Sequence, residues 1–216
     1  MNISNLEMNY TVQRSPFTET LEANWNAPVW QAAPAAEITH FRPESSAHRP
    51  PTFVRLLHGE GRLHGIFQVK DRYVRCVRTR YFDEVWKDSC VEFFVQPRSD
   101  KGYFNFEFNC GGAHLCNYIT DPTRVPGGFA RAERLPAELG KLVRIKSSLP
   151  QVVDPEMAEP VEWSLEFSIP LAVLEAYTGP LGDVSGQSWR ANFFKCAEEV
   201  SHPHWGAWSA VDEFNF

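Results

Sequence analysis

The feature that most constrains this chain is a run of seven residues in which every second side chain is a phenylalanine. The run YFNFEFN, residues 103–109, places Phe104, Phe106 and Phe108 on one side, with Tyr, Asn and Glu side chains on the other. Successive side chains of a β-strand point to opposite faces of a sheet, so this pattern predicts a strand with one buried face. The 3.6-residue period of a helix does not fit it.

A second alternating run directly precedes this one. In CVEFFVQ, residues 90–96, the apolar side chains again occupy alternate positions, and the short stretch RSDKG separates the two runs. A connection of this length predicts antiparallel neighbours. If the apolar face of one strand lies beside the apolar face of the other, Glu92 lies opposite Glu107 or Asn109.

Short alternating runs recur along the chain, whereas a helical pattern is found once. The predicted strands include residues 62–71, 72–79, 115–119, 142–147, 161–169 and 189–196, of which the first two form a predicted hairpin. The helix is PLAVLEAY, which Pro170 opens and Thr178 and Gly179 close. We therefore expect an all-β fold, a β-sandwich of two antiparallel sheets with one short helix.

The chain is expected to form one sandwich domain, residues 51–216, preceded by an irregular segment. Residues 1–50 are rich in Pro, Ala and Ser, and proline removes donors from a sheet. We interpret them as a segment packed on the domain that could contribute one strand. A length of 216 residues suits a single all-β unit.

Charge and hydropathy exclude two classes of partner. The net charge of -6 offers no general attraction to phosphate backbones, so no nucleic-acid partner is expected. There is no apolar stretch of the ~18 residues that a membrane span requires, so no membrane partner is expected. The first residues lack the pattern of a secretory signal. As written, the chain is expected in the cytoplasm, or outside it if a signal has been removed.

The cysteines form no standard metal-binding pattern. There are five, without a CxxC pair, and buried free thiols are the expected state. Cys110, His114 and Cys116 have metal-ligand chemistry, but their spacing matches no standard zinc motif. Carboxylates also crowd residues 83–92, and such groups can hold calcium, although no twelve-residue calcium loop is present.

The polar face of the two alternating strands is the strongest functional signal. It carries Glu92, Asn105, Glu107 and Asn109, although Asn and Glu are poor strand formers. Their amides and carboxylates suit sugar hydroxyls, which both donate and accept hydrogen bonds. Trp86, just before the first strand, offers a flat surface for the apolar face of a sugar ring.

Three other interpretations of these residues remain open. The polar face could simply contact water, as in many antiparallel sheets. Trp86 could pack on the edge of the sandwich. Glu92 and Glu107 could also act as the carboxylate pair of a glycosidase, although no Ser-His-Asp, Cys-His or HExxH arrangement supports chemistry elsewhere in the chain.

Several runs together resemble the family 9 carbohydrate-binding modules, especially family-9-like proteins that are nearly free-standing domains. They are VWKDSCVEFFVQP, YFNFEFNCGG, WRANFFKC and WGAWS, and the likeness spans residues 56–216. The resemblance implies a jelly-roll β-sandwich without catalytic activity. It also implies that the domain binds the end of a glucan or xylan chain between two aromatic side chains, and that calcium can be bound.

The resemblance assigns expected roles to individual residues. Trp86 matches the first stacking aromatic and Glu92 a polar contact, while Asn105 lies near another contact position. Phe216 falls where the family has its second stacking tryptophan, and it is a smaller platform. With Glu107 and Asn109 these residues form the predicted carbohydrate site.

A module without sugar binding remains an alternative. Related sandwiches bind haem through Met, His or Lys. The methionines of this chain are Met1, Met8 and Met157, which makes ligation by methionine a poor fit.

Overall fold

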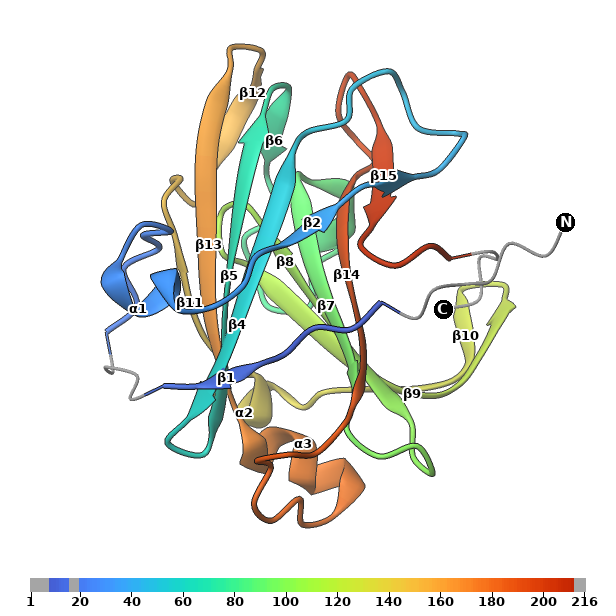
Figure 1. Cartoon of the computed structure of the whole chain (residues 1–216). Coiled ribbons are helices and arrows are strands. Elements are labelled where there is room, and N and C mark those ends of the chain that lie inside the picture. The colour runs from blue at the N-terminus through green and yellow to red at the C-terminus, as the bar shows by residue number, and fades with distance from the viewer. Residues whose placement is uncertain (1–7, 16–19, 212–216) are drawn as a thin grey trace, which may run out of the picture.

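Two β-sheets face each other in the computed structural model, which describes residues 8–15 and 20–211 (Figure 1). Sheet A contains, in spatial order, β1 (Gln13–Arg14), β4 (Thr52–Gly59), β5 (Arg62–Asp71), β13 (Val161–Pro170) and β11 (Arg144–Ser147), and β2 (Ala36–Ile38) also pairs with β4. Sheet B contains β10 (Gly128–Arg134), β9 (His114–Val125), β8 (Tyr103–Asn109), β7 (Cys90–Gln96), β14 (Arg190–Ala197), β15 (His204–Ala207) and β3 (His40–Phe41). Within the described residues only β1 and β4 pair in parallel. The predicted antiparallel sandwich is confirmed.

Aromatic rings fill the core between the sheets. Phe93 of β7 stacks on Phe167 of β13 with ring centroids 5.7 Å apart, and Phe108 of β8 stacks on the same ring at 5.1 Å. A Cβ atom on Gly65 of β5 would lie 2.2 Å from this ring, so the missing side chain allows Phe167 to approach the strand. Each ring is at most 1% exposed, and burial of a phenylalanine contributes about 1.5–3 kcal/mol.

The register of β7 and β8 is the one that keeps the apolar faces together. Phe93 pairs with Phe106, and Glu92 pairs with Glu107. Of the two partners predicted for Glu92, the structure therefore selects Glu107. Because strand side chains alternate, this register places both carboxyl groups on the face of sheet B that points away from sheet A.

The predicted hairpin of residues 62–71 and 72–79 is wrong. β5 pairs with β4 and β13, while β6 (Val74–Cys76) pairs with β12 (Val153–Met157) in a small separate sheet. Tyr73 has φ of 58°, and the chain leaves sheet A at this point. β13 offers β5 ten paired residues, far more than the short β6 could.

The helices are short. The predicted helix is confirmed as α3 (Leu171–Thr178), which follows Pro170. Two four-residue helices, α1 (Pro28–Gln31) and α2 (Ala137–Gly140), and a 3-10 turn, η1 (Val85–Lys87), complete the set within the described residues. None of these helices has the length and apolar character needed to cross a membrane.

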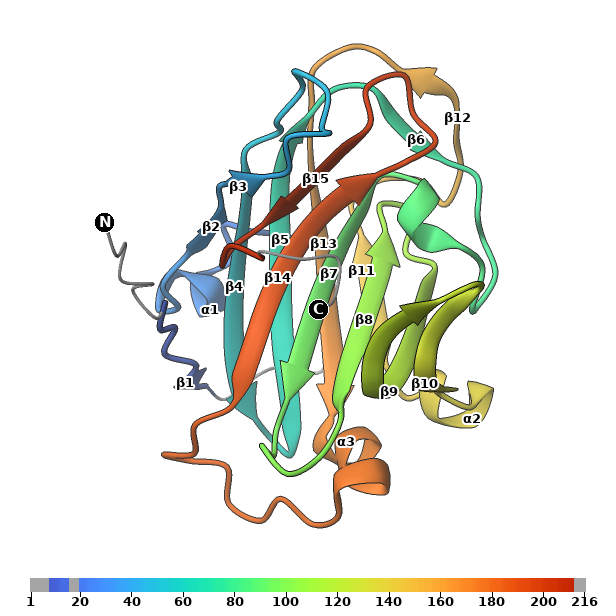
Figure 2. The ribbon, with the colours of Figure 1, turned by 90° about the vertical axis from the view of Figure 1, so that its right-hand side faces the viewer.

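The segment before residue 51 is more regular than predicted. β2 extends sheet A and β3 extends sheet B, so this segment joins both layers (Figure 2). Trp30 of α1 is 1% exposed and packs with Leu57 and Ile66 on the face of sheet A opposite the core. Prolines precede and follow these short strands, which explains why their pattern is weak in the sequence.

Candidate functional site

The candidate site is the outer face of sheet B, defined as the face that points away from sheet A. It faces the viewer in Figure 2. Val91, Phe93 and Val95 of β7 point into the core, so Glu92 and Phe94 lie on this outer face. The same alternation places outward side chains from β8, β9, β14 and β15 beside them.

Two carboxyl groups lie near the middle of this face. Glu92 is 9% exposed and its register partner Glu107 is 8% exposed. Burial raises the pKa of Glu92 to about 7. Burial and the neighbouring Glu92 together raise the pKa of Glu107 well above its ordinary value. Like charges on directly opposed strand positions repel, so the pair resists double ionisation.

Asn105 fixes the orientation of Glu107. Its Nδ2 donates to Oε1 of Glu107 at 2.8 Å, and its Oδ1 accepts the backbone N–H of Asn117 at 2.7 Å. Asn105 is 2% exposed. The three predicted residues Glu92, Asn105 and Glu107 are thus brought together, but Asn105 and Glu107 form a buried support beside Glu92.

Trp86 stands at one end of this face. It belongs to η1, is half-buried, and packs with Trp205 of β15 against a small apolar cluster of Val85, Cys90, Ala113, Leu115 and Cys196. The backbone carbonyl of Trp86 accepts a hydrogen bond from Sγ of Cys196 at 3.6 Å. Nε1 of Trp205 donates to Oε1 of Glu198 at 3.3 Å. Two indoles are therefore partly exposed near the carboxyl pair.

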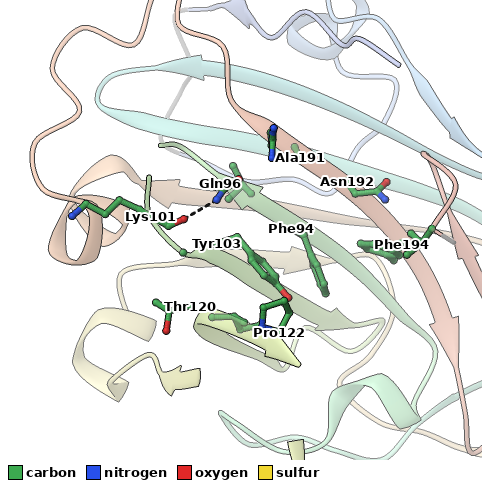
Figure 3. A pocket seen from close by; sticks show the side chains of 14 residues that line it. Phe94, Gln96, Lys101, Tyr103, Thr120, Pro122, Ala191, Asn192 and Phe194 are labelled. Carbon is green, nitrogen blue, oxygen red and sulfur yellow. Dashed lines mark hydrogen bonds between the residues drawn. The ribbon is translucent and has the colours of Figure 1, made fainter. Parts of the chain in front are cut away.

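A hollow of about 440 Å³ lies further along the same face (Figure 3). Its aromatic lining comes from Phe94, Tyr103 and Phe194, and Phe94 lies between the other two with ring centroids 5.9 Å from Tyr103 and 4.6 Å from Phe194. Polar lining comes from residues that include Gln96 and Asn192. The hydroxyl of Tyr103 is buried and has no hydrogen-bond partner in the described part of the chain, and burial raises its pKa to about 12. It therefore keeps its proton and can donate it.

A second, smaller hollow of about 60 Å³ adjoins the first. Both are lined by Phe194 and Val211. The smaller one also contacts Glu92, Trp205 and Arg42. Its volume holds about two water molecules, whereas the larger hollow falls within the range of small-molecule sites.

Asn109, a predicted sugar contact, lies in a buried hydrogen-bond network. It is 0% exposed, and its Nδ2 donates to Oδ2 of Asp88 at 2.9 Å and to the carbonyl of Arg78 at 2.7 Å. Its Oδ1 accepts the backbone N–H of Ala113. Asp88 also accepts from the Arg78 guanidinium at 2.8 Å. The amide of Asn109 therefore braces the turn that carries Trp86, and its hydrogen-bonding groups are already used.

The remaining predictions concern Phe216 and metal sites. Phe216 lies outside the described residues. The carboxylates expected around residues 83–92 form ion pairs, as Asp83 does with Arg80 and Glu84 with Lys87. Cys110 and Cys116 lie in the core and are not joined with His114 in a potential metal group. Among the described residues, one group has three ligand atoms close together, and it consists of Cys90, Glu92 and Cys196.

Most of the aromatic lining lies outside the set of residues predicted for the site. Trp205, Phe94, Tyr103 and Phe194 line the hollows, and each occupies an outward position of its strand. The signal was present in VEFFVQ and ANFFKC, where paired phenylalanines break the alternation. The second phenylalanine of each pair must leave the core, and an apolar side chain on an outward face indicates a contact surface.

Comparisons with known proteins agree with this fold. The family model described as "Carbohydrate-binding family 9" matches residues 30–215. A crystal structure of a candidate carbohydrate-binding protein from Bacteroides uniformis has 27% sequence identity and a TM-score of 0.73, covering 85% of this chain and 80% of that chain. A comparison with curated proteins found no significant match.

More distant structures share the fold alone. A family 9 carbohydrate-binding module from Caldicellulosiruptor kristjanssonii, solved with cellotriose, has 10% identity and a TM-score of 0.57, covering 91% of this chain and 82% of that one. A structure of a family 9 module from the same organism, solved with glucose, has 10% identity and a TM-score of 0.55. The match covers 91% of this chain and 84% of that one. Because the family model spans most of the sequence, this chain belongs to carbohydrate-binding family 9.

Proposed function

We propose that the chain binds carbohydrate, without catalysis, in the two joined hollows on the outer face of sheet B. The observation that carries this proposal is the larger hollow, which the rings of Phe94, Tyr103 and Phe194 line and where the Tyr103 hydroxyl has no hydrogen-bond partner in the described part of the chain. Aromatic faces cover the C–H surface of a sugar ring, and a buried donor gains most when a ligand hydroxyl satisfies it. Family membership and the Caldicellulosiruptor complexes with cellotriose and with glucose support the same ligand class.

The sizes of the two hollows support recognition of a chain end. The larger one has room for a sugar ring, whereas the smaller one, beside Glu92 and Trp205, is too small for a second ring. A glycan that enters the larger hollow cannot continue through the smaller one. In this proposal Glu92 accepts a hydrogen bond from a hydroxyl of the terminal sugar, and Trp205 lines the hollow at that end. Trp86 lines neither hollow and packs on the same apolar cluster as Trp205.

Binding without turnover is proposed because the carboxyl pair is not presented as a catalytic pair. Glycosidases place two carboxyl groups on either side of the scissile bond. Here Glu92 lines a hollow, whereas Glu107 is held by Asn105 and lines neither hollow. A calcium ion remains part of the family expectation, and the ion pairs at residues 80–88 give it no evident site there.

The test combines a glycan array with calorimetry on selected hits. Tyr103→Phe removes only the hydroxyl and should weaken binding about fivefold, the loss of roughly 1 kcal/mol expected for one hydrogen bond. Tyr73→Phe, a matched change outside both hollows, should leave affinity unchanged. A linear glucan should bind, and a cyclic glucan, which has rings but no ends, should not. No array binding, or equal affinity of wild type and Tyr103→Phe, would refute the site.

A further inference from the structure

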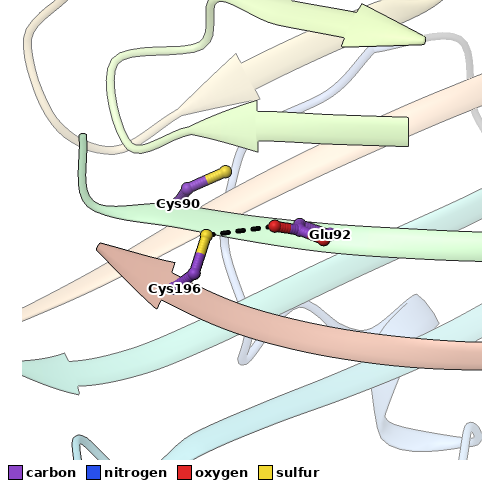
Figure 4. A group of neighbouring side chains, drawn as sticks. All are labelled: Cys90, Glu92 and Cys196. Carbon is purple, nitrogen blue, oxygen red and sulfur yellow. Dashed lines mark hydrogen bonds between the residues drawn. The ribbon is translucent and has the colours of Figure 1, made fainter. Parts of the chain in front are cut away.

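Two thiols and one carboxyl group form a compact cluster at the outer face of sheet B (Figure 4). Cys90 of β7 and Cys196 of β14 are register partners, and Glu92 lies two residues beyond Cys90 on the same face. One ligand atom from each residue lies within 4.8 Å of the other two, and Sγ of Cys196 donates to Oε1 of Glu92 at 3.0 Å. All three side chains are largely buried, with exposures of 0%, 4% and 9%.

We propose that Cys90, Glu92 and Cys196 bind one Zn²⁺ ion. Two thiolates and a carboxylate are a ligand set that zinc accepts, whereas Ca²⁺ and Mg²⁺ require oxygen ligands. Zinc–sulfur bonds of ~2.3 Å at a tetrahedral angle place two sulfur atoms about 3.8 Å apart. The present spacing of the ligand atoms therefore needs only a small adjustment around the ion.

The smaller hollow gives the ion an entry path and a fourth ligand. Glu92 and Cys196 both line it, and its volume of about 60 Å³ admits a water molecule. Three protein ligands with one open position are the pattern of accessible zinc sites, while structural sites usually have four protein ligands. The ion would therefore be exchangeable from the outer face.

The thiols of the cluster must lose their protons when they bind the ion. Burial raises the pKa of Cys90 to about 11, and the hydrogen bond that Cys196 donates to Cys90, together with burial, raises the pKa of Cys196 well above its ordinary value. Without a cation these groups keep their protons. A divalent ion replaces the protons and neutralises most of the resulting charge, and Arg42, which lines the same hollow, faces the remaining negative charge.

A second pair of thiols supplies a matched control. Cys76 and Cys110 are also fully buried and lie within hydrogen-bonding reach of each other. No carboxylate joins them in a three-ligand group in the described part of the chain. A variant that lacks this pair loses the same number of thiols but keeps the proposed zinc ligands.

The test uses Co²⁺ as a spectroscopic replacement for Zn²⁺, without sugar and with a non-thiol reductant present. Wild type and Cys76→Ala/Cys110→Ala should bind one Co²⁺ ion, with thiolate charge-transfer absorption and the visible bands of a tetrahedral site. Zn²⁺ should displace it stoichiometrically. Cys196→Ala should reduce the charge-transfer intensity about twofold, and Glu92→Gln should weaken Zn²⁺ binding at least tenfold.

The outcomes separate this proposal from sugar binding. A wild-type protein with no tetrahedral Co²⁺ spectrum would refute the zinc site, whatever the glycan array shows. The same follows if the charge-transfer intensity of Cys196→Ala equals that of wild type, or if the spectrum disappears in the Cys76→Ala/Cys110→Ala control while that protein remains folded by circular dichroism. Because Glu92→Gln keeps the shape of the side chain, it tests the ligand role even if a cysteine variant fails to fold.

Discussion

Asn105 donates a 2.8 Å hydrogen bond to Oε1 of Glu107, while Oε2 of the same carboxyl group is buried without a hydrogen-bond partner among the described residues. Glu92 occupies the directly opposed position on β7. A half-satisfied buried carboxyl beside a second one is costly for stability. Such an arrangement persists where it serves a site, which agrees with a binding role for this face.

The first prediction concerns this carboxyl pair. Glu107→Gln should stabilise the protein at pH 8 by about 1 kcal/mol, because the folded wild type must hold Glu107 protonated beside Glu92, whereas glutamine is neutral at every pH. The folded state disfavours ionisation of Glu107, so the penalty grows as the pH rises above the ordinary pKa and is absent in acid. Urea unfolding of both proteins in EDTA at pH 8 and pH 4 measures this. A variant less stable than wild type at pH 8 would contradict it.

The second prediction tests whether Asn109 stabilises the turn that carries Trp86 or contacts the glycan. Asn109→Ala should lower the free energy of unfolding by about 2 kcal/mol, since it removes one buried donor from Asp88 and one from the carbonyl of Arg78, and removes the Oδ1 acceptor of the Ala113 N–H. At a temperature well below the transition, glycan affinity should change little. Urea unfolding and calorimetry test the two effects separately. Lost affinity with unchanged stability would instead make Asn109 a ligand contact.

The third prediction tests the indoles. Trp86→Ala should lower glycan affinity about tenfold, or ~1.4 kcal/mol, while the circular dichroism spectrum stays the same. Trp205→Ala, which removes a wall of the smaller hollow, should have a similar effect. Trp25→Ala, in the cluster packed on sheet A, is the matched control and should bind normally. Unchanged affinity of Trp86→Ala would remove that indole from the site but leave the hollows as the candidate.

The fourth prediction concerns a buried charge at the end of the sandwich. Lys195 is 0% exposed, and its Nζ lies 3.6 Å from Oδ2 of Asp71 and 2.8 Å from Nε2 of His204. Lys195→Met should cost about 3–5 kcal/mol, because Asp71 then stays buried without its cation. The double variant Asp71→Asn/Lys195→Met should recover part of this loss in urea unfolding. Equal stability of the single and double variants would exclude the charge pair as the cause.

The fifth prediction concerns how the stability of the protein depends on pH through His204, the histidine beside Lys195. Burial and the neighbouring Lys195 lower the pKa of His204 to about 3, although Asp71 opposes this shift and His48 adds to it. Between pH 6 and pH 4 the unfolded chain binds a proton at this histidine and the folded chain does not, so stability falls with falling pH.

A variant isolates this contribution. In His204→Gln the fall in unfolding free energy between pH 6 and pH 4 should be less steep by about 1.4 kcal/mol per pH unit. Urea unfolding at several pH values measures both slopes. Identical slopes in the two proteins would mean that His204 titrates normally in the folded state.

Periodicity alone determined the fold class, the β7–β8 pair and helix α3, because alternation and helix boundaries are local properties of the chain. The face that carries Glu92, Asn105 and Glu107 followed from the same pattern. The tertiary structure decided what depends on distant segments. It pairs β5 with β13 rather than with β6, and it buries Asn109 in hydrogen bonds with Asp88 and Arg78. It also places Trp205 and Glu92 in the lining of one hollow and makes Cys90 and Cys196 register partners. These contacts join segments up to about a hundred residues apart, and burial of a shared core selects them, which no local pattern encodes.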